Sequence, residues 1–333
     1  MRAMLLDQFG DPSNFRLGEL PDPVAGPGQV LVRVAAASLN PVDYKVRRRG
    51  GAIAPEPPVV LGCDAAGIVE AVGESVTGFA PGDRVYGCVG GVKGLPGTYA
   101  ELVAADARLL APAPNRLTLR EAAALPLVTI TAWEGLFDRA GLQEGESVLV
   151  HGGAGGVGHV AIQLAKAKGA RVFATVSTPV KAEIARRLGA EETIDYRAEK
   201  PEAYVARLTE GRGFDVVFDA TGGSDIGTSF AAARLNGRVV TIVSSYTADL
   251  APMHGKGLSL HVVFMLIPML HDRGRARHGE ILREAAALAD AGRLRPLLDA
   301  RTFGLEDVDD AHRHLESGQA VGKVVIDVDP GLE

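Results

Sequence analysis

The strongest chemical signal in the sequence is a glycine-rich run between residues 151 and 158, His-Gly-Gly-Ala-Gly-Gly-Val-Gly. Gly153, Gly155 and Gly158 have the spacing G-x-G-x-x-G. The first glycine permits a tight turn, the second lets a pyrophosphate approach bare backbone, and the third packs a helix against a strand. The following helix would point its N–H groups at the phosphates. The run therefore predicts a dinucleotide phosphate site formed by Gly153, Ala154, Gly155, Gly156, Val157 and Gly158.

Cofactor choice is expected at the end of the next strand, where an NAD site carries an acidic residue that accepts a hydrogen bond from the ribose 2′-hydroxyl. The sequence there is Ser177-Thr-Pro-Val-Lys181, with no carboxylate. A serine and a nearby lysine suit a 2′-phosphate, so we expect NADPH. Alternatively, Lys181 is a solvated residue in the first turn of a helix.

The elements around this run alternate between strand and helix patterns. Apolar, β-branched segments predict strands at 147–151, 171–176, 193–196, 214–219, 237–243 and 258–265, with helices at 157–168 and 181–188. This alternation is typical of a doubly wound parallel sheet. Short strands predicted at 29–35, 59–61, 67–73 and 83–87 precede it, and helices at 277–291 and 305–315 with a strand at 323–327 follow. The fold class is therefore α/β.

Composition excludes several classes of function. The chain has 333 residues, a net charge of −6 and 47% hydrophobic residues. Without a basic surplus it is not expected to bind nucleic acid, and it is too apolar to be disordered. Two cysteines exclude a disulfide scaffold. The longest mostly apolar run, residues 258–270, is too short to cross a membrane, and no signal peptide is expected before Asp7. We expect a cytoplasmic protein.

Several further motifs resemble one family over nearly the whole chain. They are Asn40-Pro-Val-Asp-Tyr-Lys45, Gly62-Cys-Asp-Ala-Ala-Gly67, Gly82-Asp-Arg-Val85, Leu125–Gly135 and Glu316-Ser-Gly-Gln-Ala-Val-Gly-Lys323. Together with the glycine run they resemble the medium-chain dehydrogenases/reductases, in their quinone oxidoreductase (zeta-crystallin) branch. The resemblance implies a GroES-like catalytic domain at 1–122, a Rossmann NADPH-binding domain at 123–265, and a return to the catalytic domain at 266–333.

The sequence departs from the zinc enzymes of this superfamily at the metal ligands. Asn40 and Cys63 stand where those enzymes carry a Cys and a His, and Leu127 falls near the third position. One thiol cannot replace three N/S ligands of a catalytic zinc. We therefore expect no metal, and hydride transfer to an acceptor that is already electron-poor, a quinone or an α,β-unsaturated carbonyl.

The resemblance also suggests which side chains assist the reaction. Asn40 is placed to donate a hydrogen bond to the substrate carbonyl, where negative charge develops. Tyr44 and Lys45 are the nearest groups that carry a proton, although relatives often hold a Tyr slightly further along, and solvent is an alternative donor. Further cofactor contacts are expected by position at Thr131, which we place at the start of a helix, and at Tyr196, Thr221, Val243 and Ser244.

Three other expectations remain open at this stage. An apolar strand at 258–265 at the sheet edge favours a homodimer. A 2-enoyl thioester reductase would use the same chemistry and would need a basic entrance, for which Arg47–Arg49 and Arg273, Arg275 and Arg277 are candidates. The third alternative is a non-catalytic NADPH-binding protein.

Overall fold

The computed structural model describes residues 1–221, 226–243 and 245–332, and the chain forms two compact units. The terminal unit consists of Met1–Ile130 and Leu266–Glu333, and the central unit of Thr131–Met265. Among the predicted site residues, Ser244 lies outside the described residues. In the described part of the chain, no helix combines the length and the apolar character that crossing a membrane requires.

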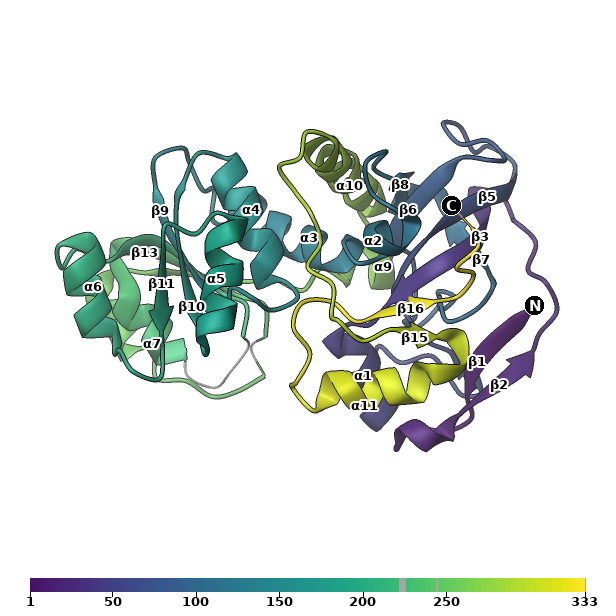
Figure 1. Cartoon of the computed structure of the whole chain (residues 1–333), viewed down its shortest axis with the longest axis horizontal. Helices are drawn as coiled ribbons and strands as arrows, with labels where there is room; N and C mark the ends of the chain where they lie inside the picture. The colour runs from purple at the N-terminus through teal and green to yellow at the C-terminus, as the bar shows by residue number, and fades with distance from the viewer. Residues whose placement is uncertain (222–225, 244, 333) are drawn as a thin grey trace. The chain divides into compact units, whose positions relative to one another are not determined.

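The central unit contains a six-stranded parallel sheet, coloured teal and green in Figure 1. Its strand order is β11-β10-β9-β12-β13-β14. Figure 1 shows α4 and α5 on one face and α6 and α7 on the other, so the inner strands are buried on both faces, as the fully buried strand β9 illustrates. The elements are η3 (Glu134–Arg139), β9 (Ser147–His151), α4 (Gly158–Ala167), β10 (Arg171–Val176), α5 (Pro179–Leu188), β11 (Glu192–Asp195), α6 (Pro201–Thr209), β12 (Phe214–Asp219), α7 (Ile226–Ala232), β13 (Ala233–Thr241), α8 (Ala251–Lys256) and β14 (Ser259–Val262).

The predicted doubly wound sheet is confirmed, and the strands at 147–151, 171–176 and 214–219 have the predicted bounds. The strand predicted at 258–265 is shorter, because β13 ends at Thr241 and its last partner in the ladder is Val262. The prediction that Thr131 opens a helix was wrong. Thr131 lies inside α3 (Pro126–Trp133), whose first residue is a proline. Proline is common at the first position of a helix.

The terminal unit is built on a seven-stranded sheet, β15-β16-β3-β5-β6-β8 with β7 also paired to β3, and a three-stranded sheet, β2-β1-β4. Its strands are β1 (Arg2–Leu6), β2 (Phe15–Glu19), β3 (Gln29–Ser38), β4 (Val59–Val60), β5 (Asp64–Val72), β6 (Arg84–Cys88), β7 (Leu102–Asp106), β8 (Leu110–Pro112), β15 (Phe303–Gly304) and β16 (Val325–Asp327). Its helices are η1 (Pro12–Asn14), α1 (Pro41–Arg49), η2 (Ala107–Leu109), α2 (Leu119–Ala123), α9 (Ile267–His271), α10 (Arg275–Asp290), η4 (Leu305–Asp307) and α11 (Val308–Glu316). Helix α3 begins in this unit, and its residues from Thr131 onward belong to the central unit.

One strand pair joins the two ends of the chain. β16 runs antiparallel to β3, with Val325 opposite Ser38 and Asp327 opposite Ala36. This register carries the residues just before β16 to the end of β3, where α1 begins. The predicted helix at 305–315 is instead the 3-10 turn η4 followed by α11.

A buried histidine in the terminal unit makes its stability depend on pH. His312 packs against the rings of Phe15 and Tyr99, at centroid distances of 5.0 and 5.9 Å. Burial, with a smaller contribution from the charge of Arg47, lowers its pKa from 6.5 to about 3. Below pH 6.5 the unfolded chain therefore binds a proton at this position that the folded protein does not bind, and the contribution of His312 to stability falls as the pH falls.

We expect this histidine to cost the protein about 2 kcal/mol of stability between pH 7 and pH 5. The variant His312→Phe keeps a ring in the cluster and removes the titration. Its Tm should therefore fall less than that of the wild type when both are measured at pH 7 and at pH 5. Parallel decreases in the two proteins would show that His312 is not responsible.

Candidate functional site

The glycine-rich turn joins β9 to α4 in the central unit. A Cβ atom added to Gly153 would lie 2.7 Å from the Cβ of Ala174, and one added to Gly158 would lie 2.2 Å from the carbonyl oxygen of Gly152. Both distances are shorter than real Cβ contacts, so these two positions require glycine for packing. Gly155, by contrast, is exposed. The packing role predicted for Gly158 fits this geometry, whereas Gly153 is needed for packing rather than for the turn, and the positive φ of 73° falls on Gly152.

The turn also offers donors for an anion. Among the described residues, no acceptor receives a hydrogen bond from the backbone N–H of Ala154, Gly156 or Val157. Val157 is the N-cap of α4 and gives the helix no side-chain cap. Free amides at the start of a ten-residue helix bind phosphate oxygens well. This geometry fits a dinucleotide pyrophosphate.

Polar side chains gather after the second strand of the central unit. Ser177 follows β10, and Lys181 lies in the first turn of α5, where its backbone N–H donates to Thr178 Oγ1 at 3.2 Å. Arg197 reaches the same place from the end of β11, because its Nη1 donates to the carbonyl oxygen of Ser177 at 3.3 Å. Its guanidinium lies 5.8 Å from the centre of the Tyr196 ring. Two cations therefore belong to this region.

Sequence reasoning named Ser177, Lys181 and Tyr196 but missed Arg197. The sequence did contain a local signal for Arg197, because a basic residue stands directly after Tyr196 at the carboxyl end of a parallel strand.

Of the remaining predicted cofactor contacts, Thr221 lies beside the glycine turn. Its Cγ2 would be 3.0 Å from a Cβ added to Gly152, and its Oγ1 donates to Asp219 Oδ1 at 2.6 Å. Val243 follows β13, and its carbonyl oxygen accepts from Thr241 Oγ1 at 2.8 Å. Thr131 is buried in the second half of α3.

In the terminal unit the predicted residue Asn40 is part of a buried polar network. Asn40 is the N-cap of α1 and is 0% exposed. Its Nδ2 donates to Asp64 Oδ2 at 2.8 Å, and its Oδ1 accepts from Lys323 Nζ. Lys323, 3% exposed, also donates to the carbonyl oxygen of Leu39 at 2.8 Å and lies 3.6 Å from Asp64 Oδ2. Both amide ends of Asn40 are thus engaged within the protein.

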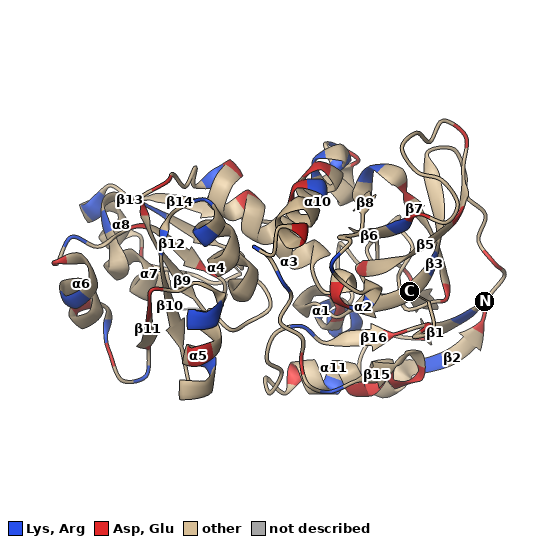
Figure 2. Cartoon of the chain, turned by 45° about the horizontal axis from the view of Figure 1, so that its top comes forward, with Lys and Arg blue, Asp and Glu red and all other residues tan. Residues whose placement is uncertain are grey.

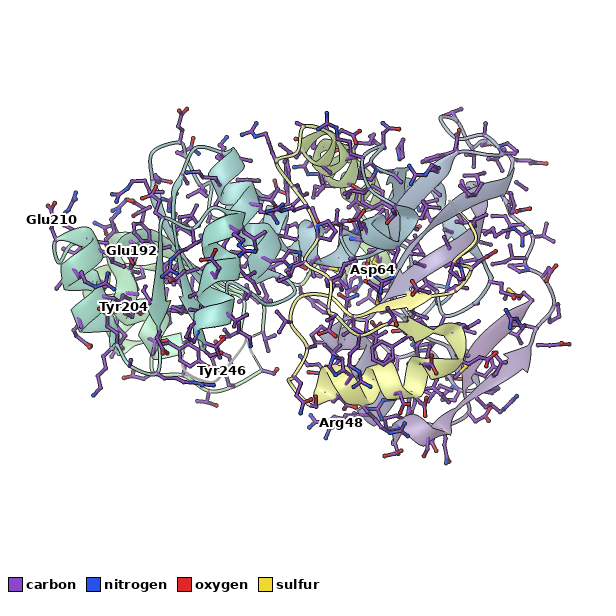
Figure 3. The ribbon with its side chains drawn as sticks, viewed as in Figure 1. Arg48, Asp64, Glu192, Tyr204, Glu210 and Tyr246 are labelled. Carbon is purple, nitrogen blue, oxygen red and sulfur yellow. The ribbon has the colours of Figure 1, made fainter. Side chains whose placement is uncertain are left out.

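Asp64, the first residue of β5, is the centre of this network, and Figure 3 labels its position in the terminal unit. Ser38 Oγ donates to its Oδ2 at 3.1 Å, and the backbone N–H of Leu127 donates to its Oδ1 at 2.9 Å. Burial raises the pKa of Asp64, and burial lowers the pKa of Lys323. Burial therefore disfavours the charged form of both side chains, and the attraction between Asp64 and Lys323 offsets part of that cost.

A second buried carboxylate, Asp43, closes the start of α1. Its Oδ2 accepts from the backbone N–H of Asn40 at 2.7 Å, and its Oδ1 accepts from the thiol of Cys63 at 3.2 Å. Burial raises the pKa of Asp43 to about 7, and a hydrogen bond with Cys88 together with burial raises the pKa of Cys63 well above its ordinary value. The structure thus brings together Asn40, Cys63 and Leu127, the three positions compared above with the ligands of the zinc enzymes, around Asp43 and Asp64.

Tyr44 and Lys45 follow on the next positions of α1. Tyr44 is half-buried and Lys45 is exposed. Burial raises the pKa of the Tyr44 hydroxyl, whereas partial burial and the neighbouring charge of Arg49 lower the pKa of Lys45. Lys45 is therefore the better proton donor of the two near neutral pH.

The arginines considered as a basic entrance are largely paired. Arg47 is buried and binds the carbonyl oxygen of Gly10 and the carboxylate of Glu316. Arg275 donates to Asp106 at 2.9 Å, and Arg277 to Glu280 at 3.4 Å. Over the ribbon as a whole, Lys and Arg alternate with Asp and Glu (Figure 2).

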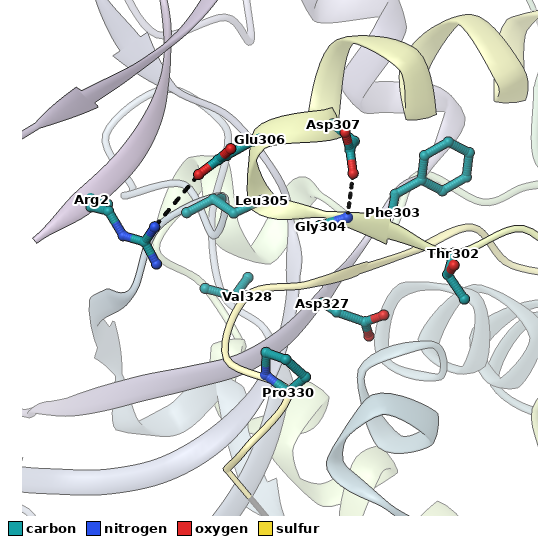
Figure 4. A pocket seen from close by; sticks show the side chains of 10 residues that line it. All are labelled: Arg2, Thr302, Phe303, Gly304, Leu305, Glu306, Asp307, Asp327, Val328 and Pro330. Atoms are coloured by element: carbon teal, nitrogen blue, oxygen red, sulfur yellow. Dashed lines mark hydrogen bonds and ion pairs between the residues drawn. The ribbon is translucent and has the colours of Figure 1, made fainter.

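A hollow of about 400 Å³ in the terminal unit contains none of the predicted site residues. Its lining includes Arg2, Gly304, Glu306, Asp307 and Asp327 (Figure 4). Arg2 lies 3.6 Å from Glu306, and Asp307 accepts from the backbone N–H of Gly304 at 2.8 Å. Asp327 accepts from Arg120 at 2.8 Å. These charged groups are paired within the protein.

A parallel sheet with a glycine turn and an uncapped helix, in a chain that also forms a separate antiparallel β unit, defines a two-unit dinucleotide-binding protein. Residues 26–115 match the family model described as alcohol dehydrogenase GroES-like domain, and residues 188–326 match the one described as zinc-binding dehydrogenase. The chain is 38% identical to the 2-methylene-furan-3-one reductase of Solanum lycopersicum, over 90% of this chain and 71% of that protein.

It is also 34% identical to the chloroplastic NADPH-dependent alkenal/one oxidoreductase of Arabidopsis thaliana, over 98% of this chain and 79% of that protein. Two of the similar solved structures serve as examples. One is an alcohol dehydrogenase superfamily protein of Novosphingobium aromaticivorans, with a TM-score of 0.94, 46% identity and coverage of 98% and 99%. The other is the quinone oxidoreductase of Coxiella burnetii, with a TM-score of 0.84, 33% identity and the same coverage.

The chain also matches a segment of a much larger protein. It spans 13% of the spectinabilin polyketide synthase system protein NorB of Streptomyces orinoci, at 38% identity over 92% of this chain. On these matches the chain belongs to the medium-chain dehydrogenases/reductases, in the quinone oxidoreductase branch. It is an oxidoreductase of that family with a GroES-like unit and a Rossmann unit.

Proposed function

We propose that the protein is an NADPH-dependent reductase of quinones or α,β-unsaturated carbonyl compounds that works without zinc. The observation that carries the proposal is the glycine turn before α4, where three backbone amides have no acceptor among the residues that the structure describes. Relatives whose names specify an alkenal/one, a furanone or a quinone substrate support the substrate class. When bound, the cofactor supplies the hydride.

Residues of the central unit hold the cofactor in this proposal. The amides of Ala154, Gly156 and Val157 bind the pyrophosphate, and Thr221 lies beside them. Ser177, Lys181 and Arg197 receive the 2′-phosphate, since two cations and a hydroxyl replace the acidic residue of an NAD site. Thr131, Tyr196, Val243 and Ser244 are proposed as further contacts along the cofactor.

Lys45 completes the reaction by donating a proton. Hydride addition to the β-carbon of an enone leaves negative charge on the carbonyl oxygen, and an ammonium group stabilises that charge and then transfers its proton. Tyr44 is the second candidate donor. We assign Asn40 to holding the start of α1 rather than to the substrate, because its side chain is fully buried and bonded to Asp64 and Lys323.

The independence from zinc rests on the donor atoms at the three ligand positions. Asn40 offers an amide that is already engaged, Leu127 offers only backbone, and the Cys63 thiol donates to Asp43. A catalytic zinc needs three N, O or S side-chain ligands and an open position. Adding EDTA to the purified enzyme is therefore expected to leave its rate unchanged.

The proposal is tested by the oxidation of NADPH against a panel of acceptors. The panel holds a naphthoquinone, an alkyl vinyl ketone and crotonyl-CoA, with a primary alcohol and NADP⁺ for the reverse direction, each repeated with EDTA. Turnover of the quinone or the vinyl ketone supports the proposal. Faster turnover of crotonyl-CoA would instead identify a thioester reductase. Tight binding of NADPH without turnover of any acceptor would identify a non-catalytic cofactor-binding protein.

We predict that Lys181→Ala and Arg197→Ala each raise the KM for NADPH by about 10- to 100-fold, because each removes a charge-assisted contact with the 2′-phosphate. The KM for NADH should not change, since NADH lacks that phosphate. Initial rates measured with both cofactors check this. Arg187→Ala, which removes an exposed arginine of α5 that pairs with Glu183, is the control. Equal effects on NADPH and NADH would contradict the assignment.

We also propose a homodimer formed through β14. This strand pairs only with β13 among the described residues, and Val262 and the nearby Phe264 are 47% and 45% exposed. An unpaired strand edge with apolar neighbours binds a second strand readily. Val262→Lys should convert a dimer to a monomer in light scattering after size-exclusion chromatography. A wild-type chain that is already monomeric would contradict the proposal.

A further inference from the structure

We propose that Lys323 and Asp64 are positioning residues that fix the orientation of the Asn40 amide, and through it the start of α1, which carries Tyr44 and Lys45. This inference rests on the proposed function and adds two residues to it. Neither residue touches the substrate in the proposed reaction; both act through Asn40.

The two partners of the Asn40 amide differ in whether they donate or accept hydrogen bonds. An ammonium group only donates and an ionised carboxylate only accepts, whereas the side-chain amide of Asn does both and has two orientations of the same shape. Lys323 Nζ donates to Asn40 Oδ1, and Asp64 Oδ2 accepts from Asn40 Nδ2 at 2.8 Å. Turning the amide by 180° would place donor against donor and acceptor against acceptor. Only one orientation satisfies both neighbours.

Burial of the three side chains makes the preference for this orientation of the amide strong. Asn40, Asp64 and Lys323 are 0%, 0% and 3% exposed, so water cannot replace a lost partner. Two further contacts hold the pair in place. Lys323 donates to the carbonyl oxygen of Leu39, and Asp64 accepts from Ser38. The amide is therefore clamped between two groups that are themselves fixed.

The clamp acts on the residue from which α1 starts. Asn40 is the N-cap of that helix, and its backbone N–H donates to Asp43, in the first turn, at 2.7 Å. Tyr44 and Lys45 directly follow Asp43. A displacement of a reacting group by about 1 Å can lower a rate by about 100-fold, so the orientation of the cap matters for turnover.

Paired substitutions separate positioning from folding. Lys323→Met leaves Asp64 as a buried carboxylate without a cation, and Asp64→Asn can set a second amide donor against Asn40. Each single variant should therefore lower Tm. The double variant Asp64→Asn/Lys323→Met contains neither charge and keeps the size of both side chains. We expect it to regain most of the lost Tm while kcat stays about 100-fold below the wild type, because the Asn40 amide is no longer held in one orientation.

Two measurements complete the test. The Kd of NADPH should be unchanged in the double variant, since the cofactor is held by the central unit. Replacing Asn40 by Ala in the double variant should lower kcat no further, because the clamp acts only through Asn40. Lys256→Met is the matched control: this lysine donates to three backbone carbonyls of the central unit and should leave kcat unchanged.

The inference is overturned if the double variant has the kcat of the wild type, if its Tm does not recover, or if Asn40→Ala lowers kcat further in that background. Failure of the proposed function is recognised separately, by a wild type that turns over no acceptor. In that case protection of the Asn40 side-chain amide protons from exchange, followed by NMR with ¹⁵N-labelled asparagine, tests the clamp. Loss of protection in the double variant supports it, and unchanged protection overturns it.

Discussion

Replacing Gly155 by valine is expected to weaken NADPH binding by about 100-fold or more without unfolding the protein. Gly155 is the exposed glycine of the turn, and within the described part of the chain an added Cβ would meet only the carbonyl oxygen of Gly152, at 3.2 Å. A branched side chain at this point keeps the pyrophosphate away from the backbone amides. Losing two hydrogen bonds to a charged group costs about 3 kcal/mol or more, which corresponds to about 100-fold in Kd.

The measurement is a fluorescence titration of NADPH with each variant, with the Tm as the check on folding. Gly255→Val is the matched control, because Gly255 is also exposed, lies in the same unit, and an added Cβ there has no neighbour within 4 Å. Gly158→Ala should behave differently from both and lower the Tm, since its Cβ would collide with the backbone of Gly152. Normal NADPH affinity in Gly155→Val would place the cofactor elsewhere.

The difference between these glycines explains why the central unit was predictable from the sequence. The glycine spacing, the apolar strand before it and the helix after it lie within a short stretch, and each duty of Gly153 and Gly158 is a contact with residues nearby in the fold. Local patterns of this kind determine local geometry. The bounds of the edge strand were less predictable, because β14 ends where its partner β13 ends.

The network around Asn40 shows where such prediction fails. Lys323 bonds to a residue 283 positions earlier in the chain, and that contact depends on the register between β16 and β3. No periodicity in the sequence specifies that register. Asp64 and Lys323 were visible in the motifs around positions 62–67 and 316–323, but their roles were not. Burial closes the Asn40 amide into a network with these two residues, whereas the sequence suggested that it donates to a substrate.

The second large effect is expected from Lys45→Met, which should lower kcat for an enone by about 100-fold or more, the usual contribution of a general acid. The wild-type kcat should fall as the pH rises through the pKa of Lys45, because the donor must be protonated. Partial burial and the charge of Arg49 lower that pKa from 10.5, so the fall begins at a lower pH than for a free lysine. The variant should lack this decrease.

A comparison of two substrates provides a second test of the proton donor. An enolate is a much stronger base than the phenolate formed from a quinone, so proton donation helps the enone more. Lys45→Met should therefore lower kcat with an alkyl vinyl ketone more than with a naphthoquinone. Arg49→Met serves as the control for charge, since it removes the neighbouring cation and should move the pH limb upward without abolishing it. If Tyr44→Phe, and not Lys45→Met, abolishes the limb, the proton comes from Tyr44. If neither does, it comes from solvent.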